Sequence, residues 1–119
     1  MVLYYKEVTI NGVANEEKTS DILTSTETAK YRVKKIWFTE VTSTLQGDAQ
    51  LRVYLEREKI LDMSYKHLLK YSGSNERVGD YAIDLDIEIP VGQTLSVGFV
   101  SGSTASDFKI AIQYEEIRA

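Results

Sequence analysis

The sequence of 119 residues predicts one all-β domain, an antiparallel β-sandwich resembling a jelly roll, with about eight strands and one short helical turn. Large apolar residues occupy every odd position from 81 to 89, and acidic residues occupy positions 84, 86 and 88, as in a strand with one buried face. Pro90 and Gly92 then break this strand before a second alternating segment at residues 94–99. Short β-rich segments recur between turn residues without a repeat or linker, so we expect residues 1–119 to form a single domain.

The remaining elements are assigned from the same alternation and from turn residues. We expect a helical turn at residues 64–70, because Tyr65, Leu68 and Leu69 have i, i+3, i+4 spacing and Asp62 or Ser64 could cap it; a strand is the alternative there. An immunoglobulin-like sandwich is the alternative fold, although the cysteine pair of antibody domains is absent. Polar residues predict loops at 14–20 and 71–79, and the other strands are expected at residues 3–10, 21–26, 31–43, 50–58, 59–63 and 108–117.

The longest expected strand, residues 31–43, contains a conflict in its pattern. Ile36 and Phe38 share one parity with three basic residues, whereas Trp37 shares the other parity with a lysine. A flat strand would therefore bury a lysine or expose Ile36 and Phe38. A β-bulge near the pair Lys34–Lys35 would switch the faces and turn Trp37 outward. In either case Trp37 or Phe38 faces outward, where a loop or the terminus covers it or where it contacts another chain or a ligand.

Two charged stripes have the spacing of alternate strand positions. Opposite charges at one spacing can pair across neighbouring strands, or between subunits, where they set register and choice of partner. We hypothesise the inter-subunit arrangement. The acidic stripe is otherwise a solvated face that keeps a sheet from mispairing, since carboxylates about 6.5–7 Å apart do not easily share one calcium ion. The basic stripe is Lys30, Arg32 and Lys34, and the acidic stripe is Asp84, Asp86 and Glu88.

Composition and motifs argue against catalysis and against a bound cofactor or metal. The only histidine, His67, has no signature that places a nucleophile or an orienting carboxylate beside it, so we interpret it as a surface residue. No nucleophile elbow, Walker loop, dinucleotide fingerprint or EF-hand spacing occurs. A net charge of −4 disfavours nucleic acid as a partner. Without cysteine, a signal peptide or a membrane span, we expect a soluble protein made in a reducing cytoplasm.

The carboxy-terminal half carries a resemblance to a family of viral proteins. Residues 84–95, Asp-Leu-Asp-Ile-Glu-Ile-Pro-Val-Gly-Gln-Thr-Leu, are followed by Ser-Gly-Ser and a last alternating strand. This half resembles the small jelly-roll modules of phage and archaeal-virus particles, which are decoration, minor capsid or fibre-associated domains, and residues 31–55 are compatible with it. The resemblance implies a non-enzymatic structural protein of a virus particle and fixes no site residue.

Two functions follow, from different classes. The leading expectation is a self-associating structural protein, a trimer or larger homo-oligomer or a partner of other structural subunits, with Trp37 or Phe38 and the charged stripes as contacts. The alternative is a carbohydrate-binding module that stacks a glycan on exposed tyrosine or tryptophan rings, with calcium held by loop acids such as Asp48 and Asp107. A hydrolase that works through carboxylates has the least support.

Overall fold

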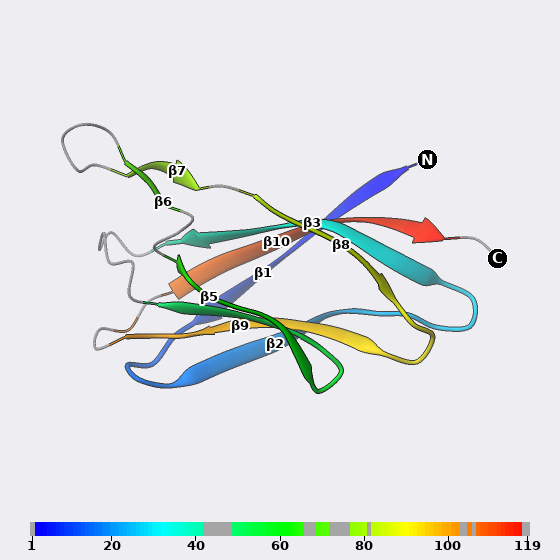
Figure 1. Ribbon diagram of the computed structural model, residues 1–119, viewed down its shortest axis with the longest axis horizontal. Coiled ribbons are helices and arrows are strands. Elements are labelled where there is room, and N and C mark those ends of the chain that lie inside the picture. The colour runs from blue at the N-terminus through cyan, green and yellow to red at the C-terminus, as the bar shows by residue number, and fades with distance from the viewer. Residues whose placement is uncertain are drawn as a thin grey trace.

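The computed structural model describes residues 2–41, 49–65, 69–71, 77–80, 82–102, 105 and 107–117, and it describes residues 40, 69–71 and 77–80 by their backbone only. The described chain folds into two four-stranded sheets, with the orders β1-β10-β3-β8 (sheet A) and β2-β9-β4-β5 (sheet B), and a small sheet of β6 and β7 (Figure 1). This confirms the predicted all-β sandwich. The strands are β1 (Leu3–Asn11), β2 (Glu17–Thr24), β3 (Lys30–Glu40), β4 (Gln50–Leu55), β5 (Glu58–Ser64), β6 (Leu69–Tyr71), β7 (Arg77–Asp80), β8 (Ile83–Ile89), β9 (Thr94–Val100) and β10 (Asp107–Ile117).

The strands pair in a nested order, which makes the sandwich a jelly roll. β1 pairs with β10, β2 with β9, β3 with β8, and β4 with β5, all antiparallel. The first half of the chain therefore runs beside the second half in reverse, and this double ribbon is folded over into two sheets. The first and last strands of an immunoglobulin domain lie in different sheets, so the pairing of β1 with β10 excludes that alternative.

Three segments differ from the sequence prediction. Residues 50–58 are not one strand but the β4–β5 hairpin, which turns at Glu56 with φ of 56°. Residues 17–20 belong to β2 rather than to a loop, because β2 is an edge strand whose polar side chains reach solvent. Of the predicted helical turn at residues 64–70, Ser64 belongs to β5 and residues 69–70 to β6, whereas Tyr65 lies in a 3₁₀ turn. Residues 66–68, with His67, lie outside the described residues, as does most of the predicted loop at 71–79.

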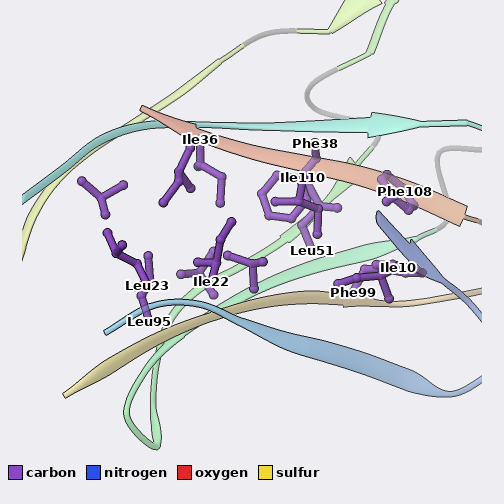
Figure 2. Packing of buried hydrophobic residues seen from close by; sticks show 14 of the residues in the cluster. Ile10, Ile22, Leu23, Ile36, Phe38, Leu51, Leu95, Phe99, Phe108 and Ile110 are labelled. Carbon is purple, nitrogen blue, oxygen red and sulfur yellow. The ribbon is translucent and has the colours of Figure 1, made fainter. Parts of the chain in front are cut away.

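The core lies between the two sheets and is almost entirely apolar. Figure 2 shows side chains from sheet A, such as Ile36 and Ile110, pointing toward Ile22 and Leu95 of sheet B. At one end of the core Phe108 packs against Phe99 and Tyr65, with ring centroids 4.6 and 4.8 Å apart. Tyr65, one of the apolar positions of the predicted helical turn, has a fully buried side chain. Aromatic packing of this kind adds to the free energy of area burial.

Two crossovers between the sheets are joined to each other by hydrogen bonds. The turn after β8 places Gly92 at φ 83°, which agrees with the predicted break. Its amide donates to the carbonyl oxygen of Ser25 (2.9 Å), and the Ser25 amide donates to the Gln93 carbonyl (3.1 Å). The buried Ser25 hydroxyl also accepts a hydrogen bond from the Tyr31 amide at 3.1 Å. The β2–β3 and β8–β9 connections therefore hold one another at the same end of the sandwich.

Candidate functional site

The outer face of sheet A is set by a β-bulge in β3. Val33 is opposite Tyr114 of β10 and Lys35 is opposite Gln113, so Lys34 between them has no opposite residue on that side. It has none on the β8 side either, where the register also shifts. Of the two alternatives that the sequence left open, the bulge near Lys34–Lys35 is therefore the correct one. Because the bulge reverses the parity of β3, the apolar residues on both sides of it point into the core.

The bulge decides between the two aromatic contact candidates. Phe38 is fully buried in the core, so it is not available to a partner, and its candidacy was wrong. Trp37 lies on the outer face and is half-buried. The ring of Tyr5, on β1, lies 6.3 Å from the Trp37 ring, and the Tyr5 hydroxyl accepts a hydrogen bond from the side-chain Nε2 of Gln113 at 2.6 Å. The N-terminal strand therefore contributes to a shared aromatic surface with Trp37.

The two charged stripes pair with each other within one chain. β3 and β8 are neighbours, so the basic residues lie across the ladder from the acidic ones. This is the intrachain alternative, and the inter-subunit hypothesis loses the free charges on which it depended. Glu115 of β10 joins the network, and Lys35 extends it. The ion pairs are Lys30–Glu88 (3.0 Å), Arg32–Asp86 (3.4 Å), Lys34–Asp86 (3.2 Å), Arg32–Glu115 (3.8 Å), Lys34–Glu115 (3.6 Å) and Lys35–Asp84 (3.8 Å).

Asp86 is the centre of this network and also the irregular point of β8. Its φ is 46°, a left-handed conformation that aspartate adopts more readily than most residues. The register shifts here, because three steps along β8 correspond to two along β3. Hydrogen bonds from Lys34 and then Arg32 lower the pKa of the Asp86 carboxyl. β8 is therefore an edge strand that is bulged, acidic and ion-paired.

The opposite edge of sheet A has none of these features. β1 pairs with β10 without a register shift from Leu3 to Asn11. Every residue from 3 to 7 is exposed on both faces of the strand, whereas Val8 is half-buried and Ile10 is in the core. The exposed fractions are 40% for Leu3, 44% for Tyr4 and 64% for Tyr5. The first half of β1 is therefore an exposed edge rich in apolar and aromatic residues.

Three tyrosines gather on the inner face of sheet A at this end. Tyr114 stacks on Tyr4 at 5.7 Å and meets the edge of Tyr31 at 5.5 Å. Burial, followed by the neighbouring Tyr31 and Tyr4, raises the pKa of the Tyr114 hydroxyl. An open groove of about 360 Å³ lies nearby, lined by Lys6, Asp21, Ile22, Leu23, Thr24 and Tyr31. Sequence reasoning missed this cluster, because the pairing of β1 with β10 joins opposite ends of the chain.

The outer face of sheet B carries a separate polar network. Arg52 on β4 contacts Glu17 of β2 at 2.9 Å and Asp62 of β5 at 3.1 Å. The Tyr54 hydroxyl also donates to Glu17 at 2.7 Å. A hydrogen bond from Lys59, with others from Gln50 and Arg52, lowers the pKa of the Asp62 carboxyl to about 2. The polar side chains of this face are thus engaged with one another across three strands.

The remaining predicted sites are described only in part. Of the two loop acids suggested for calcium, Asp48 lies outside the described residues, and Asp107 accepts a hydrogen bond from the Gly12 amide at 3.1 Å. The described residues contain no group of three His, Cys, Asp or Glu side chains that could hold a metal. The same part of the chain contains no apolar helix of membrane-spanning length. Comparison with protein-family models, curated proteins and solved structures finds no match.

Proposed function

We propose that the protein is a non-enzymatic structural module that associates with copies of itself through sheet A. One observation carries the proposal: the exposed half of β1, with Leu3, Tyr4 and Tyr5, continues into Trp37 on the outer face of the same sheet. Contiguous exposed apolar residues mark interaction sites, and tyrosine and tryptophan are enriched in the centres of interfaces. Because these residues lie on β-strands, the surface is already formed before a partner binds.

The contrast with sheet B supports the choice of surface. The outer face of sheet B has the Arg52 network, whose charges are already paired within the chain. The β8 edge of sheet A is likewise occupied by its own ion pairs. Burying such pairs in an interface would cost desolvation energy without adding new partners. The β1 side of sheet A therefore has the most to gain from association, and a decoration or minor capsid module of a virus particle would use it in this way.

Light scattering coupled to size-exclusion chromatography tests the proposal. The full chain is expected to elute as an oligomer, and Trp37→Ala and Leu3→Ser are each expected to weaken its association at least tenfold. Val91→Ser is the matched control, because Val91 is also exposed (49%) but lies at the corner between β8 and β9. A wild-type chain that stays monomeric at every concentration would contradict self-association.

A carbohydrate-binding module is the second candidate, and the groove beside Tyr31 favours it. The groove combines an aromatic ring with the polar side chains of Lys6 and Asp21, a combination that suits sugar hydroxyls and sugar faces. A glycan array separates the candidates. Specific binding of one sugar class that is lost in Tyr31→Ala or Trp37→Ala, by a monomeric protein, would favour this function over assembly.

A further inference from the structure

The geometry points to β1 as the place where two copies meet. We infer that residues 3–7 pair antiparallel with the same residues of a second copy, about a two-fold axis at Tyr5. The two four-stranded sheets A would then form one continuous eight-stranded sheet. This inference rests on the proposed self-association and names the partner and the contact.

The four edge strands of the two main sheets differ in how they are protected. Natural sheets protect their edges with bulges, prolines and inward or paired charges, because an unprotected edge is a template for another strand. In the described structure β8, β2 and β5 each lie in a ladder whose register shifts. β1 has an unbroken register of nine residues and contains neither proline nor glycine. Of these four, β1 is therefore the regular edge.

Only the first half of β1 is free to pair. The second half leads into the core at Ile10 and then into a connection that is held by hydrogen bonds, from the Gly12 amide to Asp107 and from the Asn15 amide to the Gly102 carbonyl. The first half, residues 3–7, is exposed throughout, and Figure 1 shows the N-terminal end of β1 pointing away from sheet B. A second copy could therefore approach this half without displacing its own chain.

The charges on β1 select the register. A two-fold axis normal to the sheet leaves the inner faces of both copies on the same side of the joined sheet. Such an axis must lie midway between one residue of β1 and the same residue of the second copy. An axis at Lys6 or at Glu7 would place like charges directly opposite each other, which is destabilising. An axis at Tyr5 instead places Leu3 opposite Glu7 of the second copy, and Tyr4 opposite its Lys6. The exposed half is also centred on Tyr5, so this axis uses all five of its residues.

The same axis extends the aromatic surface. Tyr5 already lies 6.3 Å from Trp37 on the outer face. At the axis, Tyr5 would face Tyr5 of the second copy, and cross-strand aromatic pairs stabilise sheets. The outer face would then carry a row of four rings, with a Trp37 at each end. On the inner face, the ammonium of Lys6 would reach the ring of the opposite Tyr4, which is a favourable contact for a cation.

Cysteine cross-linking tests the axis, because the chain contains no cysteine of its own. Directly opposite residues of antiparallel strands have Cα atoms about 4.5–5.5 Å apart, which lies within the range of a disulfide. Under mild oxidation, Tyr5→Cys is expected to form a covalent dimer on non-reducing electrophoresis. Thr9→Cys is the matched control: it is exposed, on the same strand and face, but four residues from the axis, and we expect no rapid cross-link.

A second variant removes the dependence on the Tyr5 ring. The double variant Leu3→Cys with Glu7→Cys keeps Tyr5 and places each new thiol opposite a thiol of the other copy, so it is also expected to form a covalent dimer. Association by light scattering without a cross-link in either variant would overturn the β1 contact but not self-association. A three-fold oligomer, or a cross-link that forms equally fast in Thr9→Cys, would also overturn the β1 contact but not self-association. A monomeric wild type would overturn both proposals.

Discussion

The two edge strands of sheet A, β1 and β8, both border solvent but differ in regularity and in the charge of their side chains. β8 is acidic and bulged at Asp86, and its charges are paired with those of the neighbouring strand. β1 is regular and presents exposed Leu3, Tyr4 and Tyr5. The two strands also differ in burial, because residues 3–7 of β1 are exposed on both faces whereas Ile89 of β8 is fully buried. Together these differences mean that the sheet is closed to further strands on one side and open on the other.

The largest expected difference is in how much a side chain of each edge strand contributes to the free energy of unfolding. Ile89 of β8 is fully buried, whereas Leu3 of β1 is 40% exposed. We expect Ile89→Ala to lower the free energy of unfolding by about 2–5 kcal/mol, the range for deleting a buried isoleucine side chain. Leu3→Ala should change it by no more than about 0.5 kcal/mol. Urea denaturation of dilute protein measures both, and equal losses would show that the first half of β1 is packed like β8.

A smaller effect is expected from reversing the basic stripe. Because the partners of Lys30, Arg32 and Lys34 lie on β8 of the same chain, replacing all three with Glu should lower the urea midpoint and leave the mass at low salt unchanged. For Lys30→Glu alone, which removes the exposed ion pair with Glu88, we expect a loss of about 1 kcal/mol or less. Lys109→Glu, on the outer face of β10, is the control. Dissociation of a folded oligomer by the triple reversal would restore the inter-subunit hypothesis.

The smallest effects on stability are expected from changes of pH. For β8 the effect should appear at acid pH, and for the β1 side at alkaline pH. On the β8 side, the folded pKa of Asp86 lies below its ordinary value of 3.8. The stabilisation by its ion pairs is therefore present above that value and is lost as the pH falls through the folded pKa. Asp86→Asn should flatten the acid limb of the urea midpoint plotted against pH. An unchanged acid limb would mean that these pairs contribute nothing to stability.

On the β1 side, the folded pKa of Tyr114 lies above its ordinary value of 10.0. The stabilisation that comes from burying the neutral Tyr114 hydroxyl is fully present below pH 10.0 and is lost as the pH rises through the folded pKa. Tyr114→Phe should therefore reduce the loss of stability between neutral and strongly alkaline pH, and an ultraviolet titration of the variant should lack one tyrosine that ionises above pH 10.0. A titration that loses a tyrosine of ordinary pKa instead would contradict the burial of the Tyr114 hydroxyl.

Local patterns predicted what local geometry decides. The parity conflict in residues 31–43 identified a bulge near Lys34–Lys35 as one of two alternatives, because a period of two can switch faces only by adding a residue. The choice between Trp37 and Phe38 stayed open, since it depends on the strands that lie beside β3. The turn at Glu56 was missed because it contains no glycine, proline or asparagine and continues the alternation of β4.

Non-local pairings set the remaining features. The matching spacing of the two charged stripes predicted that they could pair, but not that their strands are neighbours in one chain. The tyrosine cluster depends on β1 meeting β10, which no short segment of sequence indicates. The exposed edge follows from the same pairing, because a strand is an edge only once the order of the whole sheet is known.

The nested order of the strands has a consequence for how the chain acquires its structure. The innermost pair, β4 with β5, closes a turn of two residues, whereas the outermost pair, β1 with β10, closes a loop of nearly the whole chain. Closing a long loop costs less once the pairs inside it have formed, so we expect zipping from the β4–β5 hairpin outward. Pulse-labelled hydrogen exchange should then protect β4 first and β1 last. If β1 pairs last, it is still unpaired when a refolding chain meets another molecule. At high protein concentration, pairing of β1 with the β10 of another molecule would therefore compete with its pairing within the chain.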